Sequence, residues 1–135
     1  MKKLHLRLLV AGFLFLSCHK TNDQNPGITN TQITSGTWRI TLFTDHGTDE
    51  TTDFSGYSFS FGADGVLTTV KGSTPTAGIW SMGSKFNIGL GDKNDANKPL
   101  GELTDDWHII ATSGTSIQLG DDNASSGELL TFTKN

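Results

Sequence analysis

The sequence predicts an all-β domain of eight short strands, arranged as a sandwich or a barrel. From Gly36 onward, large apolar residues alternate with small or polar ones in short runs. This period of two is typical of half-buried strands. Clusters of Gly, Asn, Asp and Ser separate the runs at near-regular spacing, as in sandwiches and barrels. No stretch shows the periodicity of an amphipathic helix.

The first three expected strands have the clearest patterns. Residues 38–42 alternate Trp, Ile and Leu with Arg and Thr, and residues 57–61 (Tyr-Ser-Phe-Ser-Phe) form the cleanest alternation in the chain. The sequence Gly62-Ala63-Asp64-Gly65 follows, and then residues 66–70. Asp64-Gly65 supplies the positive-φ residues of a tight turn, so the second and third strands should form a hairpin.

The later strands are shorter or less regular, and a polar loop at 91–102 separates the fifth from the sixth. The expected strands are residues 77–82, 86–90, 107–111, 117–119 and 129–133.

The N-terminus has the features of a secretory signal. A basic start, Met1-Lys2-Lys3, precedes an apolar run from Leu8 to Leu16, which is too short for a membrane span of about 20 residues. The run ends in Phe15-Leu16-Ser17-Cys18, which resembles the lipobox of bacterial lipoproteins, although Leu is commoner than Phe at the first position. The resemblance implies that residues 1–17 are removed as a signal peptide. It also implies that Cys18 is acylated, with fatty acids such as palmitate.

Residues 18–35 are expected to be the lipidated cysteine and a flexible linker. The segment is polar, contains Pro26-Gly27, and has only Ile28 and Ile33 as large apolar residues. His19, rather than Asp, follows the cysteine, and the sorting rule of Gram-negative lipoproteins then favours the outer membrane. The sequence does not distinguish the periplasmic face of that membrane from the cell-surface face. The folded domain is expected to span residues 36–135.

Charge and cysteine content exclude some classes of binding partner and a disulfide-stabilised fold. Loss of Lys2, Lys3 and Arg7 with the signal peptide lowers the formal net charge from −4 to −7, which argues against nucleic acid. No polybasic patch is available for an anionic bilayer, so membrane attachment must come from the acyl chains. Cys18 is the one cysteine, so no disulfide supports the fold, and about 100 residues suffice for one hydrophobic core.

A second resemblance favours the barrel over the sandwich. Gly36-Thr37-Trp38 opens the first strand, and Gly78-Ile79-Trp80 recurs in the fourth. A Gly-x-Trp at this place resembles the lipocalin signature, and residues 36–135 look like the small lipocalin-like lipoproteins of Bacteroidota. The resemblance implies an eight-stranded antiparallel up-and-down barrel that a tryptophan closes at one end. The chain lacks the second lipocalin motif, Thr-Asp-Tyr, and is shorter, which puts a large ligand cavity in doubt.

The number of large apolar residues favours a filled barrel. An eight-stranded barrel is just wide enough to be filled by its own side chains or to hold one small ligand. Trp38, Trp80 and Trp107 are expected to be core or barrel-closing residues, and the alternative is an aromatic platform for a ligand. One face per strand gives nineteen interior residues: Trp38, Ile40, Leu42, Tyr57, Phe59, Phe61, Val66, Val70, Trp80, Met82, Phe86, Ile88, Leu90, Trp107, Ile109, Ile117, Leu119, Leu130 and Phe132.

The polar loops do not predict catalysis, a metal or a cofactor. His46 lies among several carboxylates between residues 45 and 53, an arrangement that could bind zinc or act as a base, but a solvated loop explains it. Residues 92–97 and 121–123 are rich in oxygen ligands but do not fit the EF-hand template. His108, next to Trp107, should point outward. No serine lies in a nucleophile elbow.

Two kinds of partner remain open. One is a small apolar or glycan-type ligand at the barrel mouth, near the loops around His46 and Asp92. The other is an envelope protein that binds the outer surface of a filled barrel, which would make the chain an accessory subunit or an inhibitor. Both interpretations predict a non-enzymatic protein.

Overall fold

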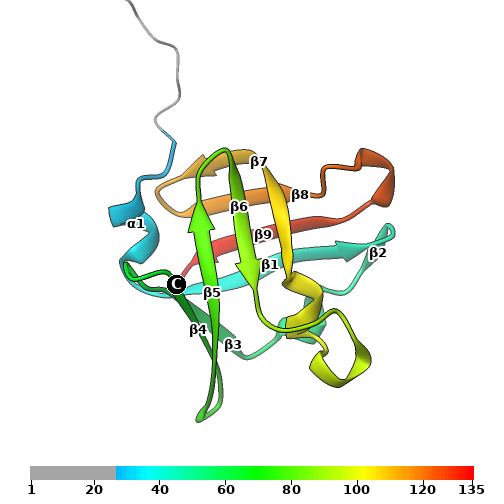
Figure 1. Cartoon of the computed structure of the whole chain (residues 1–135), viewed down its shortest axis with the longest axis horizontal. Helices are drawn as coiled ribbons and strands as arrows, with labels where there is room; N and C mark the ends of the chain where they lie inside the picture. The colour runs from blue at the N-terminus through cyan, green and yellow to red at the C-terminus, as the bar shows by residue number, and fades with distance from the viewer. Residues whose placement is uncertain (1–26) are drawn as a thin grey trace, which may run out of the picture.

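Eight antiparallel strands close into a β-barrel in the computed structural model, which describes residues 27–135 (Figure 1). Consecutive strands are neighbours, and β1 also pairs with β9, so the sheet closes. The all-β class and the up-and-down barrel are therefore confirmed. The predicted signal peptide 1–17, Cys18 and the linker residues 19–26 lie outside the described residues. The barrel strands are β1 (Trp38–Asp45), β3 (Tyr57–Phe61), β4 (Val66–Lys71), β5 (Thr74–Met82), β6 (Lys85–Gly89), β7 (Asp105–Ser113), β8 (Ser116–Gly120) and β9 (Leu129–Lys134).

The barrel is closed tightly on one side of β1 and loosely on the other. Six residue pairs join β1 to β9, but Trp38–Phe59 alone joins β1 to β3. The 3-10 helix η1 (Thr51–Phe54) covers the place where β1 and β3 diverge. Thr51 Oγ1 accepts a hydrogen bond from the Phe43 N–H at 2.9 Å, and the Phe54 ring packs edge-on against Phe43 at 5.1 Å. Side-chain contacts therefore replace the missing strand pairs.

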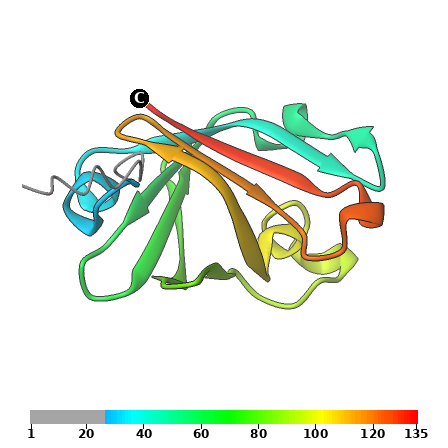
Figure 2. The ribbon, with the colours of Figure 1, turned by 90° about the horizontal axis from the view of Figure 1, so that it is seen from above.

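The two ends of the long axis differ in their connections (Figures 1 and 2). One end, named the α1 end, carries helix α1 (Asn30–Thr34) and the short turns at 62–65 and 114–115, which contact it. The other, named the loop end, carries the long connections 46–56, 90–104 and 121–128. These contain the two-residue β2 (Thr48–Asp49) and the 3-10 helices η1, η2 (Asp95–Asn97), η3 (Leu100–Leu103) and η4 (Ala124–Ser126). In the part of the chain that the structure covers, no helix is long and apolar enough to cross a membrane.

Helix α1 corrects the predicted linker. A flexible segment over all of residues 18–35 is wrong for Ile28 to Thr34, because Ile28 and Ile33 are buried against the barrel. Thr29 and Gln32 form a capping box, in which each side chain accepts a hydrogen bond from the other residue's backbone N–H. The five-residue helix is too short to show periodicity in the sequence. The folded part therefore begins near Ile28 rather than at Gly36.

Two strands turn a different face inward than the sequence predicted. The register of β1 against β9 shifts between Ile40 and Leu42, and this β-bulge buries Phe43 in place of Leu42. In β4 the interior residues are Leu67 and Thr69, whereas the predicted Val66 is 38% exposed and Val70 half-buried. A shift of one residue exchanges the two faces of a whole strand, and in β4 both faces carry a threonine next to Val or Leu, so the pattern does not decide between them. The connections also contribute core residues that the strand patterns did not indicate: Ile28, Ile33, Phe54, Leu100 and Leu103.

The corrected face of β4 gives a direct stability test. Leu67→Ala should lower the free energy of unfolding by about 2–5 kcal/mol, because it removes a fully buried side chain. Val66→Ala, one residue away, should change it by about 0.5 kcal/mol or less, because that side chain faces solvent. Urea unfolding of both variants checks the assignment, and the reverse order of effects would contradict it.

Aromatic side chains fill the centre of the barrel. Phe61 is 2% exposed, and the rings of Trp38, Trp80, Phe86 and Phe132 lie around it in edge-on arrangements, with centroids 5.3–6.4 Å away. Such aromatic pairs add to the stability that burial provides. The interior positions at this level are therefore occupied by the protein's own side chains.

Candidate functional site

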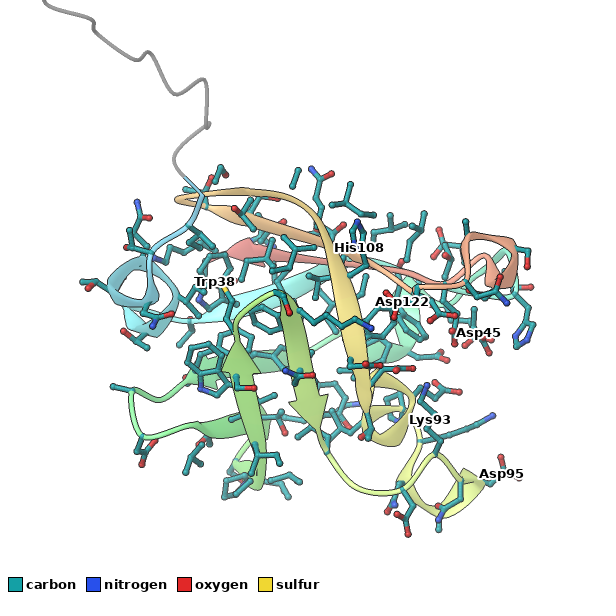
Figure 3. All side chains as sticks on the ribbon, turned by 45° about the horizontal axis from the view of Figure 1, so that its top comes forward. Trp38, Asp45, Lys93, Asp95, His108 and Asp122 are labelled. Atoms are coloured by element: carbon teal, nitrogen blue, oxygen red, sulfur yellow. The ribbon has the colours of Figure 1, made fainter. Side chains whose placement is uncertain are left out.

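A cleft of about 330 Å³ lies at the loop end, where the β1–β2 turn, the β6–β7 connection and the β8–β9 connection meet. It lies between the loop around His46 and the loop around Asp92. These are the loops near which the sequence predicts that a ligand binds. Figure 3 shows Asp45, Lys93 and Asp95 at this end, opposite Trp38. The lining is mainly polar and charged: Phe43, Asp45, His46, Lys93, Asn94, Asp95, Lys98, Glu102 and Glu128.

The β1–β2 turn holds His46 at the rim of the cleft. His46 and Gly47 both have positive φ, 48° and 77°, which is the conformation of a tight type I′ hairpin turn. The His46 side chain is 82% exposed, and its Nδ1 lies 2.6 Å from Asp45 Oδ1. That oxygen is itself buried, and apart from this contact it has no hydrogen-bond partner among the described residues. The histidine thus lies in solvent, as expected of a polar loop residue.

One group of carboxylates lies beneath the turn. Asp45, Glu50 and Glu102 each offer an oxygen, and these oxygens lie within 4.8 Å of one another. Burial raises the pKa of Glu50, and repulsion from Glu102, Asp45 and Asp53 raises it further. Asp45 and Glu50 flank the β1–β2 turn, whereas Glu102 comes from the distant β6–β7 connection, so no local motif indicates the whole group.

A second group of carboxylates joins the β6–β7 connection to the β8–β9 connection. Oxygens of Asp105, Asp121 and Glu128 lie within 4.8 Å of one another. Burial raises the pKa of Glu128, while a hydrogen bond with Ser126 lowers the pKa of Asp121. Glu128 also lines the cleft, so this group continues its acidic wall.

Two lysines act as counter-ions in these groups. Lys93 Nζ lies 2.5 Å from Asp105, and Lys98 Nζ lies 3.4 Å from both Asp95 and Glu102. Burial alone would lower the pKa of Lys93, but Asp105, Glu128 and Asp121 raise it. The ammonium groups neutralise part of the acidic charge, and carboxylates still outnumber lysines in the lining of the cleft.

The three tryptophans lie in the core and not in the cleft. Trp38 and Trp107 are fully buried, and Trp80 is 9% exposed. Each indole N–H donates a hydrogen bond of 2.8–2.9 Å to a backbone carbonyl. Trp38 donates to Ile33, Trp80 to Gly62 and Trp107 to Leu103. Trp38 contacts α1 and so lies under the helix that covers its end of the barrel. His108 is exposed on the outer face of β7.

The charge of Glu128 should make stability depend on pH. Its pKa is higher in the folded protein than the ordinary value of 4.5, so the folded state loses stability as the pH rises through this window. Glu128→Gln should therefore raise the melting temperature at about pH 7. The difference should vanish at about pH 3.5, where Glu128 is also uncharged. Calorimetry of both proteins at the two pH values tests this, and a variant less stable at neutral pH would contradict it.

Comparison with known proteins supports the fold and says nothing about the function. No family model matches the chain, and no curated protein matches it. A crystal structure of a DUF4847 family protein from Bacteroides vulgatus is similar, with a TM-score of 0.55 and 17% sequence identity. The match covers 76% of this chain and 94% of that one. A protein of a Bacteroidota species thus has a similar barrel.

Proposed function

We propose that this chain is a lipoprotein of the cell envelope, anchored through Cys18 and placed in the outer membrane. Its lipocalin-like barrel would act as a non-enzymatic binding module. The lipobox resemblance at residues 15–18 supports the anchor. Helix α1 begins at Asn30, so a short stretch of chain separates the folded domain from Cys18. The loop-end cleft supports the binding role.

The ligand is of the glycan type rather than apolar. The observation that carries this choice is the combination of a barrel centre filled by aromatic rings with a polar cleft outside it. An apolar ligand needs a concave apolar pocket, whereas hydroxyl groups can bond the carboxylates, the Asn94 amide and the lysines of the cleft. The excess of carboxylates disfavours strongly anionic glycans.

Binding is favoured over hydrolysis because lysines already pair with carboxylates at this end. Lys98 Nζ lies 3.4 Å from Glu102, and Lys93 Nζ lies 2.5 Å from Asp105. A glycosidase needs carboxyl groups that reach the scissile bond as acid and as base or nucleophile.

A glycan array probed with the Cys18→Ser chain tests the proposal, since this chain lacks the anchor. We expect binding to neutral or amino-sugar glycans. The double variant His46→Asn, Asp95→Ala should weaken the binding by about tenfold or more, since about 1.4 kcal/mol of lost contact is a factor of ten. Both side chains are exposed at the rim, so the fold should tolerate their loss.

The matched control is Gln118→Ala, which removes an exposed polar side chain from β8, outside the cleft. It should bind as the parent does. No glycan binding, or equal loss in the rim variant and the control, would contradict the proposed site. Native mass spectrometry of protein extracted from the envelope would then show whether a different small molecule is bound.

One observation favours a protein partner as the second candidate. Ile79 is 68% exposed on the outer face of β5, beside its register partner Val66, which is 38% exposed. Exposed apolar patches often mark protein interfaces. Ile79→Lys should abolish a crosslink to an envelope protein, while Gln118→Lys should keep it. A crosslink that survives Ile79→Lys would exclude this patch.

A further inference from the structure

The charges of the barrel are distributed unevenly between its two ends. Residues 27–135 contain thirteen of the chain's 14 Asp and Glu residues. All but Asp64 lie in the three long connections of the loop end or in the strand ends beside them. These residues are Asp45, Asp49, Glu50, Asp53, Asp92, Asp95, Glu102, Asp105, Asp106, Asp121, Asp122 and Glu128. Lys93 and Lys98, and Lys85 through its pairs with Asp106 and Asp122, offset them only in part.

Among the described residues, the α1 end lacks this excess of acidic side chains. Lys134 Nζ donates to the Gln32 carbonyl at 2.7 Å and to Ser35 Oγ at 2.9 Å, so its ammonium group is fixed beside the helix. The Arg39 guanidinium donates to the Lys134 carbonyl at 3.0 Å. Asp64 is the acidic residue here, in the turn that contacts α1, and its carboxylate accepts from the Val66 N–H.

The chain also leaves the barrel at the α1 end. The Ile28 N–H donates to Thr112 Oγ1 at 2.9 Å, and the Ile33 carbonyl accepts from Trp38, so this segment is fixed to the barrel. Nine residues, 19–27, separate this point from Cys18. At the full extension of about 3.3–3.6 Å per residue they reach at most about 32 Å.

We infer that the α1 end of the barrel faces an anionic lipid surface and that the acidic loop end, with its cleft, points away from it. The inference rests on the proposed acylation of Cys18. The eight residues of β1 span about 26 Å, whereas the electrostatic potential of a charged surface decays over about 8–10 Å. The two ends therefore experience different potentials, and repulsion acts on the loop end whenever it approaches the headgroups.

The orientation determines where a ligand comes from. A cleft on the side away from the bilayer is open to molecules in the aqueous space beyond the membrane. It is turned away from lipids in the membrane that holds the anchor. This agrees with a polar ligand, and it deepens the proposed function by assigning the ligand to the aqueous side.

Fluorescence quenching on vesicles tests the orientation. In the processed, acylated chain the Cys18 thiol is blocked, so a newly introduced cysteine can be labelled alone. Thr115→Cys places a fluorophore at the α1 end and Ala124→Cys places one at the loop end, and both parent residues are exposed. The chains are inserted into vesicles of phosphatidylethanolamine and phosphatidylglycerol that carry a quencher on the headgroups.

We expect the label at position 115 to be quenched at least about threefold more than the label at position 124, because the ends are about 20–26 Å apart. In vesicles of phosphatidylcholine alone the ratio should fall, and an unchanged ratio would overturn the electrostatic cause. Equal quenching at both positions, as for a barrel lying on its side, would overturn the orientation alone. Labelling of the parent chain at Cys18 would instead show that the anchor is not formed, and would overturn the proposed attachment together with the inference.

Discussion

Phe61→Ala is expected to lower the free energy of unfolding by about 3–5 kcal/mol, the cost of removing a buried aromatic ring and leaving a cavity. Phe61 is the residue around which four other aromatic rings pack, from β1, β5, β6 and β9. Its loss therefore weakens contacts between strands that are distant in the sequence. For a domain of about 100 residues, this is a large fraction of a total stability near 5–15 kcal/mol.

Denaturant unfolding followed by tryptophan fluorescence measures the effect, since Trp38 and Trp80 both contact Phe61. Phe61→Leu is the matched control, because it keeps much of the apolar volume, and its cost should be less than half as large. If Phe61→Ala cost under about 1 kcal/mol, as exposed residues do, the barrel centre would not be packed as described.

Cys18→Ser is expected to move nearly all of the protein out of the membrane fraction, or to leave it as an uncleaved precursor. The physical reason is that, in the proposed lipoprotein, acyl chains on Cys18 supply the attachment, and a mature net charge of about −7 gives no electrostatic attraction to an anionic bilayer. Fractionation of cells and the mass of the processed chain measure this.

Ser17→Ala is the matched control for the anchor, because it keeps a small residue before the cleavage point. This variant should be processed and should stay with the membrane. A Cys18→Ser chain that is cleaved and remains membrane-bound would contradict the lipoprotein assignment. The result is independent of the cleft, so the anchor and the binding role can fail separately.

The strands themselves could be predicted because their signals are local. The alternation in residues 57–61 and the Asp64-Gly65 turn predicted the β3–β4 hairpin, which the structure confirms. Which face of each strand points into the barrel was harder to predict from the sequence. In β4, threonines separate the apolar residues, and in β1 a bulge shifts the pattern after Ile40, so Leu67 and Phe43 took the interior positions expected for Val66 and Leu42.

Helix α1 also could not be predicted from the local sequence. Ile28 and Ile33 look like isolated apolar residues in a polar segment, and nothing nearby in the sequence can bury them. The barrel end supplies the surface, through Thr112 and the Trp38 indole. A segment that reads as a linker therefore becomes part of the domain.

The sequence by itself determined the all-β class, the number of barrel strands and the aromatic residues that fill the barrel, because alternation and turn signals depend on neighbouring residues. Only the tertiary structure decided which acidic residues share a cleft. Asp45 ends β1, while Glu102 and Glu128 lie in two connections, up to 83 positions away, and the closure of β1 on β9 brings all three to one end. The charge difference between the two ends arises in the same way. Each loop alone looks like an ordinary hydrophilic turn, and their sum along one direction exists only once the chain has closed into a barrel.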